Sequence, residues 1–412
     1  MTSSATERTF DAAVEVLKGN STPRGLKASS SYYNQVWARD SFISFLGSNM
    51  LGDETLLSCA RATVDTFARS RSPLGQIANF YDPANGRADF GFSGSTDSAP
   101  WYIIGLADLY RATDDRSLLK EPLDAAVDAY RWLRYQDSNN SWLVDSPQGA
   151  DWMDAAIQRT GKTVYNNALL LMATRCIGDL CSVAGRRLND GSKLDYTALL
   201  ERFNDVFLPD EESPKRVSGF SPRLAEQLSS QRPVGLSQEY YVQYVSFARI
   251  DTHFDTLSNL LCILFGLAES KTSRSIMEAI RSRELSKPYP VRVLDPPYSA
   301  GEPGFDTRLD ATLPEQHRSP PFAYHNGGIW PFVGGLYVWA LNKLGSEEAP
   351  TGLDRLAAAN MVRGEGDGLG FNEWLHGRSG RPLGQRAQSW NAGAYIAAYL
   401  SIEKGDRLSV IR

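Results

Sequence analysis

The chain has 412 residues, of which 42% are hydrophobic and 22% charged, a composition that is typical of a globular protein and excludes an intrinsically disordered one. The formal net charge is only −5 and no long run of Lys or Arg occurs, which argues against a nucleic-acid-binding surface. No apolar stretch of 18 residues could span a membrane, and the N-terminal 20 residues lack the hydrophobic region of a signal peptide, so we expect a cytoplasmic protein.

Apolar residues recur with the helical period of 3.6 through most of the chain. We predict twelve helices, at about residues 5–18, 38–50, 53–69, 98–112, 116–135, 163–185, 193–205, 255–268, 272–283, 326–343, 351–362 and 387–404. Strand patterns are scarce, since only WLVDS and VRVLDPP read as short β-type pieces. The expected fold class is therefore all-α.

Five long loops separate the predicted helices, and all are rich in Gly, Pro, Asp, Asn, Tyr or Trp. They lie at about residues 71–97, 136–162, 206–250, 286–325 and 363–386. Loops this long are uncommon unless they carry function. Twelve helices fit six hairpins in a toroid, an (α/α)6 barrel, with the loops collected at one end. Because no linker divides the chain and no 30-to-45-residue repeat indicates an α-solenoid, we expect a single catalytic domain over residues 1–412.

Several predicted loop-to-helix junctions combine a polar side chain, an aromatic residue and a small residue. They are QVWARDSF, GSTDSAPWY, ADWMDA, AYHNGGIWPF and GFNEWLHG. A single acid at such a junction is most often a helix N-cap. A helix cap does not require a nearby tryptophan. Each of these junctions nevertheless has one within three residues of its polar side chain: Trp37, Trp101, Trp152, Trp330 and Trp374. Saccharide sites do combine aromatic rings with carboxylates and amides, so these junctions favour a carbohydrate site.

Glycoside hydrolysis needs two carboxyl groups and neither metal nor cofactor. Other chemistries fit less well: GFSGS lacks the spacing of a nucleophilic serine, and no strand leads into the glycine-rich GEGDGLGF as a dinucleotide site requires. The four histidines have no zinc-binding spacing, and a lyase or epimerase would call for paired histidines or a tyrosine base. We therefore expect no metal, no cofactor and a small saccharide as the partner, with a homo-oligomer left open.

In order and spacing, QVWARDSF, GFSGSTDSAPWYIIGL, YHNGGIWPF and FNEWLHGRSGRPLGQRAQSW resemble motifs of the neutral/alkaline invertases and related (α/α)6-barrel glycosidases, over about residues 30–404. The resemblance implies an inverting glycoside hydrolase that acts on a small neutral saccharide, sucrose first. It implies Asp97 as the general acid and Glu373 as the general base. The substrate-binding residues expected with them are Trp37, Arg39, Asp40, Trp101, Trp152, Asp154, Tyr324, His325, Asn326, Trp330, Trp374 and Gln388.

The surroundings of the two expected catalytic carboxyl groups differ. Burial beside Trp101 would raise the pKa of Asp97, whereas the helix N-terminus would favour its charged form. Ser98 is a suitable N-cap, which would leave Asp97 free to face a cavity. Glu373 has polar neighbours in the sequence, among them Asn372 and Arg378, and this setting would keep it ionised.

Two departures from the invertase pattern concern the substrate. Ala99-Pro100 replaces the residues that follow the acid in the invertases, and ADWMDA with GKTVYNNALL resembles debranching enzymes and mannosylglycerate hydrolases more closely. The alternative is therefore an α-glucosidase or α-mannosidase of that type. An alternative of a different class is an inactive sugar-binding protein on the same barrel.

Overall fold

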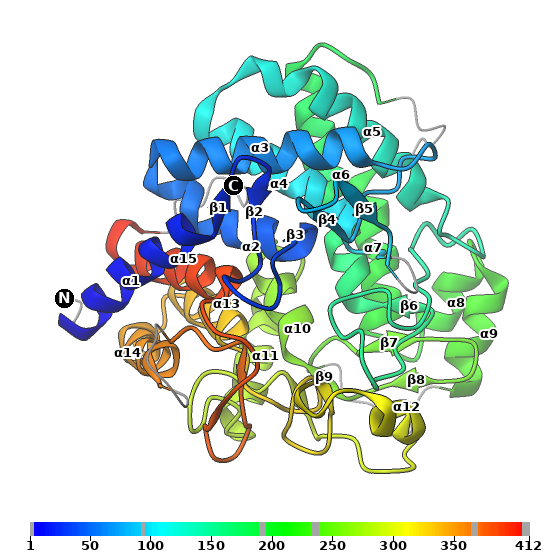
Figure 1. Ribbon diagram of the computed structural model, residues 1–412. Helices are drawn as coiled ribbons and strands as arrows, with labels where there is room; N and C mark the ends of the chain where they lie inside the picture. The colour runs from blue at the N-terminus through cyan, green and yellow to red at the C-terminus, as the bar shows by residue number, and fades with distance from the viewer. Residues whose placement is uncertain (1–3, 92–94, 189–194, 232–238, 364–369, 406–412) are drawn as a thin grey trace.

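A computed structural model describes residues 4–91, 95–188, 195–231, 239–363 and 370–405, and helices dominate these segments (Figure 1). The α-helices are α1 (Ser4–Asn20), α2 (Ala38–Ser48), α3 (Glu54–Ser70), α4 (Ser98–Thr113), α5 (Glu121–Arg134), α6 (Val164–Val183), α7 (Tyr196–Phe207), α8 (Ser213–Ser218), α9 (Pro222–Gln231), α10 (Thr256–Leu264), α11 (Ser270–Ser282), α12 (Thr307–Thr312), α13 (Pro331–Lys343), α14 (Ala349–Met361) and α15 (Ser389–Lys404). None of the described helices combines the length and the apolarity that a membrane crossing requires. The prediction of an all-α fold class is confirmed.

Short strands make small ladders in the loops. They are β1 (Ser21–Thr22), β2 (Gly25–Leu26), β3 (Val36–Trp37), β4 (Phe80–Asp82), β5 (Arg87–Asp89), β6 (Lys162–Thr163), β7 (Tyr244–Val245), β8 (Ile250–Asp251), β9 (Phe254–Asp255), β10 (Leu294–Asp295), β11 (Trp374–Leu375) and β12 (Pro382–Leu383). All of their pairings are antiparallel: β3-β4-β5 and β6-β7-β8 form three-stranded sheets, and β1-β2, β9-β10 and β11-β12 form pairs.

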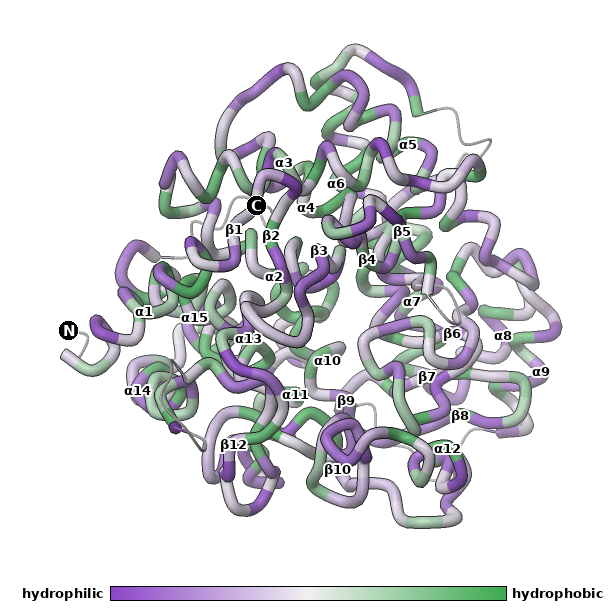
Figure 2. The backbone as a smooth tube through the Cα atoms, in the orientation of Figure 1, coloured by the Kyte–Doolittle hydropathy of each residue, from purple (hydrophilic) through white to green (hydrophobic). Residues whose placement is uncertain are grey.

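Six helices form a closed ring. In this ring α2 packs on α4, α4 on α6, α6 on α10, α10 on α13, α13 on α15, and α15 on α2 again. The helices α1, α3, α5, α7, α11 and α14 pack on its outside, and outer and inner helices alternate along the chain. All of α2 is buried, whereas α11 buries only one face. Figure 2 accordingly shows many of the hydrophilic residues in the outer helices and loops, as around α12.

Three element predictions differ from the structure. The helix predicted at 326–343 begins only at Pro331, because Gly327 has a φ of +88°, which does not continue a helix, and Pro331 suits a first turn. The helix predicted at 116–135 is divided before Pro122, with a 3₁₀ turn preceding α5. The predicted loops 206–250 and 286–325 contain the short helices α8, α9 and α12, which were missed because they are only 6 to 10 residues long.

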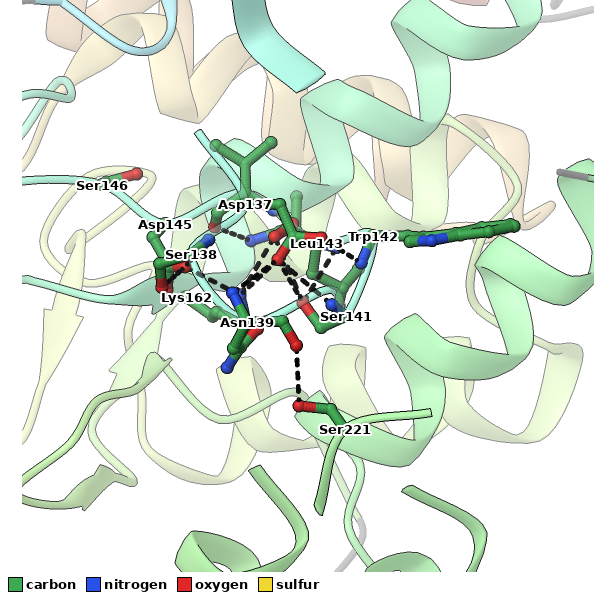
Figure 3. Close-up of polar contacts among 12 residues, drawn as sticks. Asp137, Ser138, Asn139, Ser141, Trp142, Leu143, Asp145, Ser146, Lys162 and Ser221 are labelled. Carbon is green, nitrogen blue, oxygen red and sulfur yellow. Dashed lines mark hydrogen bonds and ion pairs between the residues drawn. The ribbon is translucent and has the colours of Figure 1, made fainter. Parts of the chain in front are cut away.

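A buried lysine braces the loop between α5 and α6 (Figure 3). The Lys162 side chain is 1% exposed, and its Nζ donates to the carbonyl of Leu143 at 3.0 Å and to Asp145 Oδ2 at 3.1 Å. Asp137 lies 3.7 Å from the same Nζ, and its carboxylate accepts backbone N–H groups of the loop, including that of Trp142. A bridge between Ser146 and Gly161 then closes the segment 146–161. This segment carries several of the predicted site residues.

Glycines allow the inner helices α2 and α15 to approach closely. A Cβ atom on Gly47 of α2 would overlap the carbonyl oxygen of Gly393, and one on Gly393 of α15 would overlap the backbone of Ser44. The two helices therefore touch backbone to backbone, which only the absence of a side chain permits.

We expect Gly393→Ala to lower the free energy of unfolding by about 1–3 kcal/mol, because the added methyl group must push α2 and α15 apart. The matched control is Gly178→Ala in α6, where a Cβ would meet nothing within 4 Å. This control should raise stability by about 0.5–1 kcal/mol, since alanine favours a helix over glycine. Urea unfolding of both variants measures the difference. An equal effect of the two substitutions would contradict the close packing.

Candidate active site

A cavity lies where the N-terminal ends of the inner helices meet. It is lined by Tyr33, Trp37, Arg39, Asp40, Trp152, Asp154, Tyr324, His325, Trp330, Glu373, Gln388 and Trp390. Arg39 and Asp40 belong to the first turn of α2, Trp330 immediately precedes α13, and Gln388 immediately precedes α15. We call this cavity the first chamber. The volume open to the centres of water molecules is about 60 Å³. Because one water needs about 10–15 Å³ of this kind of volume, the chamber has room for roughly four to six waters, which is about the size of one sugar ring.

Ten of the fourteen predicted site residues line the first chamber, and four do not. The four are Asp97, Trp101, Asn326 and Trp374. Two residues of the first chamber, Tyr33 and Trp390, were not predicted from the sequence. Trp390 lies two residues after Gln388 in the same motif, and Tyr33 lies four residues before Trp37, so aromatic residues beside the chosen motifs were the available signal.

The residues outside the chamber have structural contacts instead. The Asn326 side chain donates to the carbonyls of Tyr298 and Ser319 at 3.0 and 2.9 Å and accepts from the Tyr298 N–H, so it clamps three loop segments together. Trp101 is fully buried and donates from Nε1 to the hydroxyl of Tyr165 at 2.9 Å. Trp374 directly follows Glu373 and packs its ring near that of Tyr324.

Asp97 lies behind the chamber wall. It is fully buried, and its Oδ2 accepts from Arg39 Nη1 at 2.7 Å and from the Tyr165 hydroxyl at 3.2 Å, while its Oδ1 accepts from the Ser95 hydroxyl at 2.6 Å. It directly precedes α4, but its side chain makes no capping hydrogen bond. Asp97 rather than Ser98 occupies the N-cap position, so the expectation that Ser98 caps α4 is wrong, although the Asp97 carboxylate does not act as a cap. It faces Arg39 rather than an open cavity.

Arg39 joins Asp97 to the chamber. Its Nη1 binds Asp97, and its Nη2 lies 3.6 Å from Asp154 Oδ2, so one guanidinium bridges a buried carboxylate and a chamber carboxylate. Although burial alone would lower the pKa of Arg39, the carboxylates of Asp97 and Asp154 raise it, so the guanidinium stays charged. Asp154 is the more accessible partner, with 39% of its side chain exposed.

Glu373 is fixed by its backbone and by two donors. It precedes β11, its Oε2 accepts from the Gln385 N–H at 3.0 Å, and its Oε1 accepts from the Tyr33 hydroxyl at 3.4 Å. A Cβ on Gly384, whose φ is +70°, would come within 2.5 Å of Glu373 Oε2. This glycine therefore lets the β11–β12 hairpin close around the carboxyl group.

Burial raises the pKa values of the chamber carboxyl groups. Burial, with the nearby charges of Asp40 and Asp154, raises the pKa of Glu373 to about 8 against the opposing hydrogen bond from the Gln385 N–H. Burial likewise raises the pKa of Asp154 and that of Asp40 to about 6. The prediction that polar neighbours keep Glu373 ionised is wrong, because Glu373 is only 3% exposed and its sequence neighbours do not solvate it. Burial beside Arg39 also lowers the pKa of His325 well below its usual range, so this imidazole is neutral.

Several polar atoms of the chamber have no hydrogen-bond partner among the described residues. They are Trp37 Nε1, Arg39 Nε, Trp152 Nε1, His325 Nδ1, Gln388 Nε2 and Trp390 Nε1, all buried. Buried polar groups are normally paired, so a set of them around aromatic rings indicates a site for a ligand with many hydroxyl groups.

A second chamber adjoins the first. It has a volume of about 250 Å³ and is lined by Trp37, Arg39, Asn79, Phe80, Asp89, Gly91, Ser95, Gly149, Ala150, Asp151 and Asp154. Trp37, Arg39 and Asp154 line both chambers and therefore form the boundary between them. A larger cavity of about 680 Å³, lined by Tyr135, Lys162, Phe247 and others, contains none of the predicted site residues. Among the described residues, no group of three or more His, Cys, Asp or Glu side chains could hold a metal ion.

Comparison with known proteins places the chain among glycosidases. The family model described as amylo-alpha-1,6-glucosidase matches residues 11–363. "Probable alkaline/neutral invertase D" from Arabidopsis thaliana is 32% identical, over 92% of this chain and 77% of the relative. "Cytosolic invertase 1" from Oryza sativa subsp. japonica is 25% identical, over 92% of this chain and 73% of the relative. A GH63 mannosylglycerate hydrolase from Thermus thermophilus, solved with Tris and D-glycerate, has the same fold, with a TM-score of 0.63 and 16% identity over 94% of this chain and 99% of that one.

Proposed function

The chain belongs to the amylo-alpha-1,6-glucosidase family and is an invertase-like glycoside hydrolase, and from this premise we propose that it hydrolyses a small neutral saccharide, sucrose first, with inversion at the anomeric carbon. One observation carries the proposal: Asp154 and Glu373 line one aromatic chamber in which buried donors lack partners among the described residues. Two carboxyl groups are sufficient for hydrolysis with inversion.

In this proposal Asp154, rather than Asp97, donates the proton to the leaving oxygen. A saccharide that occupies both chambers has its scissile bond at their boundary. Of the three boundary residues, Trp37, Arg39 and Asp154, only Asp154 carries a carboxyl group that can donate a proton. Its exposure and its place at the boundary suit this role, whereas Asp97 is fully buried and bound to Arg39.

Glu373 is the proposed general base. It lines the first chamber and not the boundary, so it can face a water on the side of the sugar ring away from the leaving group. Because burial raises the pKa of Glu373 to about 8 and that of Asp154 only to about 6, the proton of the singly protonated pair lies mainly on Glu373, and the reactive form is the minor one in which Asp154 holds it. In that form the Gln385 N–H and the Tyr33 hydroxyl stabilise the ionised Glu373. Asp97 is then a positioning residue, because it holds the guanidinium that contacts Asp154.

The finer parts of the proposal have separate support. The closed ring of six inner helices with alternating outer helices supports six hairpins in an (α/α)6 barrel, within one catalytic domain. The invertase relatives support sucrose, while the family model favours the second candidate, an α-glucosidase or α-mannosidase. A cytoplasmic location is supported by the cytosolic invertase of rice, although other relatives are named mitochondrial or chloroplastic.

We expect Asp154→Asn and Glu373→Gln each to reduce sucrose hydrolysis by about 10²–10⁴-fold, the usual size of a general acid–base contribution. Asp97→Asn should reduce it less, since this residue acts through Arg39. Glucose release by the purified variants measures all three effects, and circular dichroism checks that each variant is folded. If Asp97→Asn were inactive while Asp154→Asn kept most of the activity, Asp97 would be the donor.

A glycosyl fluoride of the cleaved sugar separates the two roles, because fluoride leaves with little protonation. Asp154→Asn should recover most of the wild-type rate with this substrate, and Glu373→Gln should not. If Glu373→Gln recovered the rate and Asp154→Asn did not, Glu373 would be the general acid and Asp154 the general base.

The stereochemistry is expected to be inverting. Proton NMR of the first-formed sugar, recorded before mutarotation, distinguishes the anomers for sucrose, an isomaltose-type glucoside and a glycerate-linked sugar. Retention of configuration would contradict the proposed direct attack of water. The substrate with the highest kcat/KM decides between the invertase and the second candidate.

The pH dependence of kcat/KM should be bell-shaped, with limbs near pH 6 and pH 8 and a maximum between them. Below about pH 6 both carboxyl groups are protonated, so no base can take the proton of water. Above about pH 8 both are ionised, so no acid can protonate the leaving oxygen. Initial rates on sucrose, with melting temperatures at each pH as a control for unfolding, test this. A rate still undiminished at pH 4.5 would contradict it.

A further inference from the structure

The second chamber is rich in acids. Asp89, Asp151 and Asp154 line it, and Asp89 at the end of β5 is exposed. Asp89 uses one oxygen to accept the Gly91 N–H at 2.6 Å. Asp151 is 4% exposed and bound by Arg159, but Arg159 also binds the buried Asp255, so one cation faces two carboxylates beneath the chamber floor.

No cation among the described chamber residues is available to an incoming anion. Arg39 is the only Arg or Lys among the described residues that line either chamber, and although its Nε has no hydrogen-bond partner among the described residues, its charge is already balanced by the contacts of Nη1 with Asp97 and of Nη2 with Asp154. His325, the one lining histidine of the first chamber, is neutral because burial lowers its pKa. Recognition of a carboxylate normally uses a free Arg or Lys, and the described lining residues offer none.

From this arrangement we infer that the second chamber accepts a neutral, hydroxyl-rich leaving group and excludes one that carries a carboxylate, with Asp89 as a specificity-determining residue. Hydroxyl groups can donate to the carboxylate of Asp89, whereas a carboxylate in the same space can only accept and is repelled by Asp89. This inference rests on the proposed function, since it assigns the second chamber to the leaving group. The Thermus enzyme that was solved with D-glycerate would differ from this chain in that preference.

A matched pair of substrates tests the inference. Glucosylglycerol and glucosylglycerate differ only in a CH₂OH against a carboxylate on the leaving group. We expect the wild-type enzyme to have a kcat/KM at least tenfold higher for glucosylglycerol at low ionic strength. Because the exclusion is electrostatic, about 0.5 M NaCl should narrow the ratio by raising the rate on glucosylglycerate. Equal or better use of glucosylglycerate, or a ratio indifferent to salt, would overturn the inference.

Two variants isolate the contribution of Asp89. Asp89→Asn should raise kcat/KM for glucosylglycerate several-fold by removing the repulsion and should lower that for glucosylglycerol, because an amide oxygen accepts from a hydroxyl more weakly than a carboxylate does. The control is Asp82→Asn, in which the acid belongs to the same three-stranded sheet, also accepts a backbone N–H, and does not line the chamber. This control should leave the ratio of the two kcat/KM values, for glucosylglycerol and for glucosylglycerate, unchanged. If both variants changed this ratio equally, Asp89 would not be the residue that determines the specificity.

Binding to Glu373→Gln separates this inference from the proposed hydrolysis. By calorimetry, this variant should bind glucosylglycerol more tightly than glucosylglycerate. If the wild-type enzyme hydrolysed neither conjugate nor sucrose but the variant kept this order of binding, the proposed hydrolysis would fail and the selectivity would stand. Tighter binding of glucosylglycerate, or binding of neither, would overturn the selectivity.

Discussion

The guanidinium of Arg39, held between Asp97 and Asp154, is the contact on which the site depends. Asp40, Asp97 and Asp154 come from separate segments, and without a cation among them their burial and mutual repulsion would favour the protonated forms of these carboxyl groups. Because a buried ion pair adds little net stability, this arrangement is better understood as a constraint on geometry than as a source of folding energy. Arg39 can perform this role because it lies in the first turn of α2, at the end of the ring where the other polar residues gather.

The same principle positions the loop between α5 and α6. Three buried cations hold this region: Arg39 binds Asp154, Arg159 joins Asp151 to Asp255, and Lys162 binds Leu143 and Asp145. The segment has almost no regular secondary structure, so its polar groups must find partners elsewhere. Ion pairs of buried charged residues, rather than the hydrogen bonds of a helix or a sheet, therefore hold Trp152 and Asp154 in place. They also join this loop to α4 through Asp97 and to α10 through Asp255.

Much of this architecture could be predicted from the sequence, because the inner helices are mostly buried and rich in apolar residues, and several of them follow a polar and aromatic motif. Ten residues of the first chamber followed from those motifs. The proposed exchange of Asp97 for Asp154 as the acid did not, since only the three-dimensional packing places Asp97 behind Arg39 and Asp154 in the chamber. The sequence could not distinguish the two possible roles of Asn326, because an amide that joins loop segments and one that binds a sugar look the same in it. The ionisation of Glu373 depends on burial by segments remote in sequence, such as Tyr33, which its own neighbours do not reveal.

The excess of acids has two consequences that arise from one electrostatic cause. Hydrolysis of a glycoside passes through an oxocarbenium-like transition state, in which positive charge develops on the sugar ring. Preorganised negative groups around the ring favour that state over the neutral substrate, which is the condition for catalysis. The same negative potential opposes an anionic leaving group, because the one guanidinium among the described lining residues is already neutralised by Asp97 and Asp154. In the proposed mechanism, a site that binds an anion at this boundary would need a further cation, and that cation would weaken the stabilisation of the transition state. The preference for a neutral substrate that we infer is thus a consequence of how the chamber is charged for the proposed hydrolysis.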